Sequence, residues 1–140
     1  MIRLRTATAN DRTALIALLT EADMDYTDPL GAYTLAVEEG IIAGCGRLED
    51  HGHFAMLRPL VVAEPYRERG VGRLILQGIM PADKPTVLVA RSDAIAFYEM
   101  MGFSHTGWNV VSTSQTAECE SCPNRAECMP QPMIHIPAGY

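Results

Sequence analysis

The stretch that decides the fold lies in the middle of the chain and reads Leu60-Val61-Val62-Ala63-Glu64-Pro65-Tyr66-Arg67-Glu68-Arg69-Gly70-Val71-Gly72-Arg73-Leu74. We interpret it as a strand, a tight turn rich in Arg and Gly, and the beginning of a helix. Glycines allow backbone N–H groups to come close to an anion, and the start of a helix adds partial positive charge. The stretch therefore suits a diphosphate, with full charges from Arg67, Arg69 and Arg73. A turn that serves only packing would have the same glycines.

Two other phosphate-binding motifs are absent from the sequence. The chain has no Gly-x-x-x-x-Gly-Lys-Ser/Thr, so the turn is not a P-loop. The three-glycine dinucleotide pattern is missing as well, because Gly70-Val71-Gly72 is followed by Arg73 and Leu74.

Outward from this stretch, apolar periodicity and turn residues predict alternating strands and helices. We expect strands over 1–6, 33–37, 41–48, 53–62, 86–90 and 103–111, and helices beginning at Thr8–Asp11, Gly70–Gly72 and Ser92–Asp93. The inward face of the second helix is expected to consist of Val71, Leu74, Ile75 and Ile79. This order predicts an α/β (α+β) fold with a mixed central sheet of about six strands and helices on both faces.

Two motifs in this order resemble the GNAT superfamily of N-acetyltransferases. Arg67-Glu68-Arg69-Gly70-Val71-Gly72 matches the signature Arg/Gln-x-x-Gly-x-Gly/Ala, and the strand before it has the expected Leu-x-Val ending. The later segment Ala94–Phe103 looks like the second hallmark, a helix that carries Phe-Tyr and ends in Gly-Phe. The resemblance covers residues 1–111, which we expect to form the acetyltransferase domain. Residues 112–140 are expected to be a Cys- and Pro-rich extension packed on the same domain.

The resemblance implies acetyl-CoA as cosubstrate and a sheet that splays to admit the pantetheine arm. Backbone groups of Val61, Val62 and Ala63 would pair with that arm. The implied diphosphate ligands are the N–H groups at Arg69, Gly70, Val71, Gly72 and Arg73. Tyr98 would be the general acid that protonates the departing thiolate, unless it is simply a core aromatic residue. The amine would attack the thioester directly, with no acyl-enzyme, so Cys45 is expected to pack in its strand.

The general base is predicted in the segment Glu49-Asp50-His51-Gly52-His53, between two expected strands. Any of Glu49, Asp50, His51 and His53 could accept a proton directly or through water. We take Glu49 as the candidate, and the alternative is that all four are exposed turn residues.

Arg58 is the candidate substrate ligand. Leu57-Arg58-Pro59-Leu60-Val61-Val62 is similar to the Leu-Arg-Ser-Leu-Ala-Val segment of short amino-acid and arsenic-resistance acetyltransferases, with Pro59 in place of a small polar residue. An arginine here could hold a substrate carboxylate in bidentate fashion. A surface arginine paired to an acid is equally compatible with the sequence.

The C-terminal segment carries three cysteines, Cys119, Cys122 and Cys128, and resembles the Cys-Pro-x-x-x-x-Cys-Met ending of one type of arsenic-resistance acetyltransferase. Three thiolates could bind zinc, with no evident fourth ligand unless His105 or His135 reaches the site. They could also bind a trivalent arsenical, or two of them could form a redox pair. A clasp that packs on the sheet is the remaining alternative, and we predict no metal.

Composition bounds the function. With 48% hydrophobic and 20% charged residues, the chain has the balance of a globular protein. A net charge of −6 without a basic cluster argues against nucleic-acid binding, and no apolar run approaches the roughly 20 residues of a membrane span. We find no signal peptide and expect a cytoplasmic protein that could form a homodimer.

The expected function is transfer of an acetyl group from acetyl-CoA to the primary amine of a small carboxylate-bearing molecule, an amino acid or its arsenic or phosphorus analogue. The alternatives are acetylation of a protein or peptide, a non-catalytic acetyl-CoA sensor, and a metalloid-binding protein.

Overall fold

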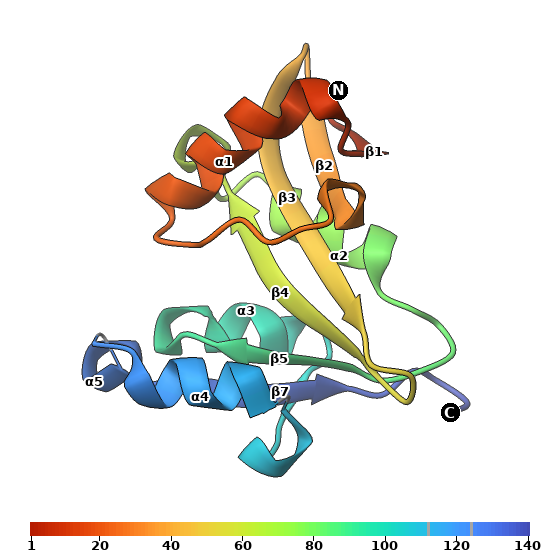
Figure 1. Cartoon of the computed structure of the whole chain (residues 1–140). Helices are drawn as coiled ribbons and strands as arrows, with labels where there is room; N and C mark the ends of the chain where they lie inside the picture. Colours follow the sequence, from red (N-terminus) through yellow and green to blue (C-terminus); the bar gives the residue numbers. More distant parts are fainter. Residues whose placement is uncertain (112, 124) are drawn as a thin grey trace. The chain divides into compact units, whose positions relative to one another are not determined.

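The computed structural model describes residues 1–111, 113–123 and 125–140, leaving aside the side chains of 113–115 and 118. Within these residues, seven strands form one mixed sheet in the order β1-β2-β3-β4-β5-β7-β6 (Figure 1). The strands are β1 Arg3–Thr6, β2 Tyr33–Glu38, β3 Ile41–Asp50, β4 Ala55–Val62, β5 Thr86–Ala90, β6 Ser104–His105 and β7 Gln131–His135. The α-helices are α1 Arg12–Glu21, α2 Val71–Ile79, α3 Ile95–Met100, α4 Thr113–Ser121 and α5 Arg125–Cys128. The predicted α/β architecture is confirmed, with seven strands where about six were expected.

The chain divides into two compact units, which are described separately. The first unit comprises residues 1–49 and 57–80, and the second comprises residues 50–56 and 81–140. Strand β4 contributes its first two residues to the second unit and the rest to the first. The predicted division at residue 111 follows the resemblance and stays a prediction.

In the first unit, β1, β2 and β3 form an antiparallel meander. Strands β2 and β3 make the predicted hairpin, with Tyr33 opposite Arg47 and Glu38 opposite Ile41. Its turn uses Glu39 and Gly40, both at positive φ. The long ladder of this hairpin is the scaffold on which both helices of the unit pack.

Helix α1 covers one face of these strands. A 3₁₀ turn over Ala9–Asp11 leads into α1 at the predicted helix start. It begins with a capping box, in which the Thr8 N–H donates to Asp11 Oδ2 at 2.7 Å. Leu15, Leu18 and Leu19 point inward and are buried. They form a core with residues of both hairpin strands and of β4, namely Tyr33, Leu35, Cys45 and Val61. We call this side of the sheet the α1 face.

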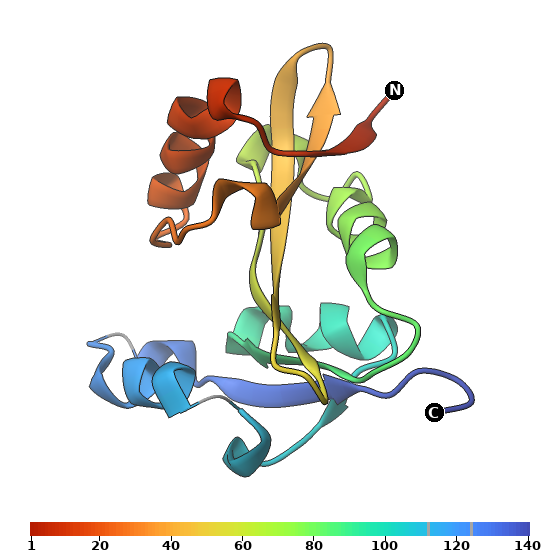
Figure 2. The same cartoon turned by 45° about the vertical axis from the view of Figure 1, so that its right-hand side comes forward.

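Helix α2 covers the opposite face, as Figure 2 shows. Ile75 is fully buried and Val71 nearly so, as predicted, but Leu74 is 37% exposed and Leu76 takes its place inside. Successive helical residues are about 100° apart, so the buried face is centred beyond Ile75, toward Leu76, and Leu74 falls outside its other edge. The helix lies close to β3 because that strand presents Gly44 and Gly46 on this side.

The second unit is built around β5 and β7, which lie side by side in both views (Figures 1 and 2). They pair antiparallel from Thr86 opposite His135 to Ala90 opposite Gln131. The recorded parallel pairing of β4 with β5 consists of Ala55 with Thr86 and Met56 with Val87. The GNAT resemblance implies that β4 and β5 separate beyond these two pairs, and this separation stays a prediction.

The expected last strand over 103–111 is wrong in extent. Only Ser104–His105 is a strand, and a 3₁₀ turn over Trp108–Val110 follows. Strand β7 lies between β5 and β6 and was not predicted as a strand. Pro132 removes one N–H from β7, which is why a proline-rich segment did not look like an interior strand.

Candidate active site

The Arg/Gly turn joins β4 to α2 within the first unit. After β4, a 3₁₀ turn spans Glu64–Tyr66, and Gly70 with φ +78° is the N-cap of α2. The first helical hydrogen bond runs from the Leu74 N–H to the Gly70 carbonyl at 3.0 Å. The N–H groups before Leu74 therefore have no acceptor inside the helix, which makes the start of α2 suited to an anion.

The three arginines of the turn differ in their surroundings. Arg67 Nε donates to the Val62 carbonyl at 3.2 Å. Arg69 pairs with Glu38 at 3.4 Å and lies over the Tyr66 ring at 5.1 Å. Arg73 is exposed in the first turn of α2. Arg67 and Arg69 thus brace the turn, and Arg73 presents its charge to solvent.

The backbone groups at the end of β4 differ in their hydrogen-bond partners. The Ala63 N–H donates to the Ala43 carbonyl at 2.8 Å, and the Ala63 carbonyl accepts from Tyr66 at 2.9 Å. The Ala63 N–H is therefore already used by β3, and its predicted contact with the pantetheine arm stays a prediction. Along a strand, the backbone N–H and C=O groups of successive residues point to opposite edges. Those of Val61 therefore point toward β3, like the Ala63 N–H, and those of Val62 point away from β3.

Tyr98 lies on α3 in the second unit and is buried. Its ring meets Phe97 and Phe103 edge to face, with ring centroids 5.1 and 5.6 Å apart. Burial disfavours the phenolate and so raises the pKa of Tyr98 above its ordinary value. The phenol keeps its proton at neutral pH, as a general acid must, and its aromatic neighbours are also those of a core residue.

Glu49, the candidate base, is held by an arginine that the sequence reasoning missed. Arg47 Nη1 donates to Glu49 Oε2 at 2.7 Å, and both side chains leave the same face of β3. Arg47 is only 7% exposed. The signal for it was present in the sequence, since Arg47 occupies an inward position two residues after Cys45 in a predicted strand.

The other candidate bases belong to the loop of the second unit. Asp50 accepts from the Gly52 N–H at 2.9 Å and from Lys84 at 3.1 Å, and these two hydrogen bonds lower its pKa. The His51 ring stacks on Phe54 with centroids 4.9 Å apart. Asp50, His51 and His53 are all exposed. For these three, the geometry favours the turn-residue alternative.

Arg58 and Cys45 lie on adjacent strands of the first unit. Arg58 is half-buried, and its backbone carbonyl accepts from Arg47 Nη1 at 3.3 Å. Cys45 is fully buried among the apolar residues of the α1 face, and burial raises the pKa of its thiol to about 12. A thiol that stays protonated is a poor nucleophile. This supports the expectation that Cys45 is a packing residue.

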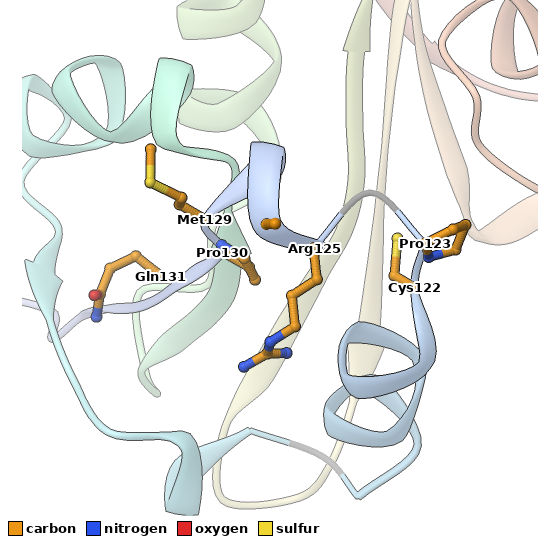
Figure 3. A pocket seen from close by; sticks show the side chains of 7 residues that line it. Cys122, Pro123, Arg125, Met129, Pro130 and Gln131 are labelled. Atoms are coloured by element: carbon orange, nitrogen blue, oxygen red, sulfur yellow. The ribbon is translucent and has the colours of Figure 1, made fainter.

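Cys119, Cys122 and Cys128 form no disulfide, and Cys122 lines a cavity. A hollow of about 700 Å³ is lined by Cys122, Pro123, Arg125, Ala126, Met129, Pro130 and Gln131. Figure 3 shows Arg125 extending from the start of α5 between Cys122 and Gln131. Its guanidinium lies 5.1 Å from the centre of the Trp108 ring. Burial raises the pKa of Cys128, with smaller effects from Arg91, Cys119 and Cys122. Among the described residues, no group of three or more His, Cys, Asp or Glu side chains is placed to hold a metal ion.

Solved structures with the same fold carry coenzyme A. N-acetylglutamate synthase from Neisseria gonorrhoeae, complexed with coenzyme A and N-acetyl-glutamate, aligns over 97% of this chain and 35% of its own, with a TM-score of 0.76 and 12% identity. Rv2747 from Mycobacterium tuberculosis, in complex with CoA and NLQ, aligns over 96% and 98% at TM-score 0.73 and 15% identity. Arabidopsis thaliana Naa50, in complex with the bisubstrate analogue CoA-Ac-MVNAL, aligns over 95% and 96% at TM-score 0.69 and 21% identity.

Sequence comparison gives the family. The uncharacterized protein YyaT of Bacillus subtilis (strain 168) is 29% identical over 76 residues, 51% of this chain and 51% of that protein, so the match spans about half of the relative's length. In the described part of the chain, no helix combines the length and the apolar character needed to span a membrane. The family model for the acetyltransferase (GNAT) domain matches residues 29–105, more than half of the 140 residues and including both motifs. The chain therefore belongs to the GNAT acetyltransferase family.

Proposed function

We propose that this protein is an N-acetyltransferase that moves an acetyl group from acetyl-CoA to the primary amine of a small carboxylate-bearing substrate. The observation that carries the proposal is the Arg/Gly turn on a GNAT fold, with Gly70 capping α2 in a left-handed conformation. The N–H groups of Val71, Gly72 and Arg73 would hold the diphosphate, and the exposed Arg73 side chain would add its charge. The Val62 N–H would pair with the pantetheine arm, while the Val62 carbonyl accepts from Arg67 Nε.

The reaction needs one proton removed and one supplied. The amine lone pair attacks the thioester carbonyl carbon, the C–S bond breaks, and the thiolate leaves with a proton from Tyr98. The amine proton goes to Glu49 directly or through water. The raised pKa of Tyr98 supports its role as the donor, and the buried, protonated Cys45 supports direct transfer without an acyl-enzyme.

Arg58 supports a substrate that bears a carboxylate, in line with the resemblance to short amino-acid acetyltransferases. The arsenic-resistance subgroup and trivalent arsenical binding by the tail thiols are finer proposals that rest on that resemblance alone. Acetylation of a protein N-terminus is the second candidate function. The likeness to Naa50, whose bisubstrate analogue carries a peptide, favours it, and the net charge of −6 would suit basic peptides.

The test follows CoA release with acetyl-CoA against amino acids, glutamate analogues and basic peptides. Coenzyme A is quantified by chromatography, so that the protein's own thiols do not interfere. In the enzyme, Tyr98→Phe should lower turnover by about a hundredfold or more while thermal stabilisation by acetyl-CoA persists. Turnover equal to wild type would remove Tyr98 from the mechanism. Stabilisation by acetyl-CoA without turnover on any acceptor would favour the sensor alternative.

A further inference from the structure

Arg47 is a buried cation with an unfilled donor. It lies on the α1 face of β3, and the whole side chain is within the first unit. Nη1 donates to Glu49 at 2.7 Å and to the Arg58 carbonyl at 3.3 Å. Nη2 donates to the Asp28 carbonyl at 3.4 Å, at the edge of hydrogen-bonding distance. Nε is buried and has no hydrogen-bond partner among the residues that the structure describes.

Stability alone is a poor reason for this arrangement. Removing a guanidinium from water is costly, and a buried ion pair can often be replaced by apolar residues of similar size without loss of stability. The surrounding residues of the α1 face are apolar, so a methionine or leucine at position 47 would fit the pattern. A buried N–H without an acceptor adds a further cost. The arrangement therefore points to an acceptor that joins Nε in the working protein.

The unfilled donor, the Nε N–H, lies on the edge of the guanidinium that Nε and Nη2 form. Both hydrogens of Nη1 are used, so the occupied end of the group faces Glu49 and β4. The remaining edge, Nε with Nη2, offers two parallel N–H groups, of which one is empty and the other makes a long bond. Two parallel N–H groups match the two oxygens of a carboxylate.

The loop between α1 and β2 contacts the Nη2 end of this edge through the Asp28 carbonyl. Tyr26 from that loop stacks on Tyr33 with centroids 5.6 Å apart, and Arg12 lies 5.0 Å from the Tyr26 ring centre. Arg47 itself lies 6.0 Å from the Tyr33 ring centre. Asp28, whose carbonyl makes the long bond, is exposed. The contact of Nη2 with this loop is thus made by the backbone carbonyl of an exposed residue.

We propose that the Nε edge of Arg47 binds the carboxylate of the acceptor substrate, with Nη2 shared between that carboxylate and the Asp28 carbonyl. This rests on the proposed function and names the residue that recognises its substrate class. The same guanidinium holds Glu49 on its other end, so an amino acid bound in this way would have its amine beside the candidate base. Arg58 then contributes its backbone carbonyl to the orientation of Arg47.

The test compares matched acids and amides in wild type, Arg47→Met and Arg47→Lys, with Arg3→Met as the charge control on the exposed edge of β1. L-glutamate and L-methionine are paired with their α-amides, in the presence of acetyl-CoA for turnover and of CoA for calorimetric binding. In wild type the acid should be preferred. In Arg47→Met the acid-over-amide preference should fall by about ten- to a hundredfold in KM. Turnover of acid and amide should fall together, because Glu49 loses the arginine that holds it, so the readout is the ratio of the two KM values. Arg3→Met should keep the preference.

Several outcomes overturn the proposal. One is a wild-type protein that binds acids and amides alike, as expected if a water molecule satisfies Nε. Another is an Arg47→Met variant that keeps the preference while Arg58→Met loses it. If Arg47→Met unfolds, Arg47→Lys decides, because an ammonium offers a point charge without the two-pronged edge and should keep only part of the preference. Carboxylate-selective binding that depends on Arg47 but without acetyl transfer would reject the proposed function alone. Acetyl transfer by Arg47→Met with an unaltered preference for acids over amides would reject only the proposed role of Arg47.

Discussion

Gly44 is the position where the packing of α2 on the sheet can be tested with one methyl group. A Cβ built there would lie 2.7 Å from the Val61 carbonyl oxygen, 3.1 Å from Ile75 Cδ1 and 3.3 Å from Val71 Cγ1. The first contact is with backbone in the neighbouring strand, which cannot rotate away. Val71 and Ile75 are the inward residues of the first turns of α2, directly after the Arg/Gly turn.

The magnitude follows from these distances. Carbon–oxygen contacts normally begin at about 3.3 Å, so Gly44→Ala leaves an overlap of about 0.6 Å against rigid backbone. Relieving it requires β3, β4 or α2 to shift, and overpacking of this kind costs about 1–3 kcal/mol. For a domain of this size, that corresponds to a fall in Tm of roughly 4–12 °C. A displaced α2 should also weaken acetyl-CoA binding severalfold, because its first turn supplies the proposed diphosphate donors.

The matched control is Gly31→Ala, where a Cβ would meet nothing within 4 Å and φ is not positive. This variant should be as stable as wild type or slightly more stable, because alanine lowers the entropy of the unfolded chain. Thermal unfolding with and without acetyl-CoA, together with calorimetric titration, measures both effects. If Gly44→Ala matches Gly31→Ala in Tm and in affinity, the close packing of α2 on β3 does not exist as described.

Three further predictions follow from local geometry. Asp11 accepts two hydrogen bonds from Arg5 at 2.7 and 2.8 Å, and these lower the pKa of the Asp11 carboxyl below its value in the unfolded chain. The stabilisation of the fold by the ionised Asp11 is therefore present above about pH 4 and is lost as the pH falls. In urea unfolding, Asp11→Asn should cost about 1–2 kcal/mol at pH 7 and much less near pH 2, and a cost independent of pH would contradict this reading. Gly70→Ala forces a side chain into the left-handed region at φ +78° and should cost about 1–2 kcal/mol and weaken acetyl-CoA binding, unlike the control Gly31→Ala. The Cys45 thiol is buried and has a pKa of about 12, so in the folded protein it should resist iodoacetamide at pH 8 while the exposed Cys122 reacts. Rapid labelling of both thiols would contradict the burial of Cys45 in the core.

The first unit was largely predictable because its signals are local. Alternating apolar residues marked the hairpin, Thr8 and Asp11 marked the start of α1, and glycines marked the turn before α2. These features depend on residues close in sequence, and the structure keeps them nearly unchanged. The error at Leu74 arose where the choice between two neighbouring apolar residues depends on how the helix is rotated against the sheet.

The parts that were missed depend on distant residues. Strand β7 is short and carries a proline, and only the exposed edge of β5 explains why it becomes a strand. The segment 103–111 was predicted as a strand from its local pattern of apolar residues, which does not show where β7 pairs. Arg47 was missed for a related reason, since its partners come from positions as far apart as Asp28 and Arg58. Burial of a charge is visible only when those segments meet.

The position of β7 has a consequence for how the chain folds as it is synthesised. Strand β5 is made before β7, and residues 91–130 separate the two. During that interval β5 has an unpaired edge of apolar residues, which is a template for pairing with another chain. Closing so long a loop also makes the β5–β7 pairing a late and slow event. The second unit should therefore be the part of the nascent protein that aggregates first, and the part that gains most from a chaperone.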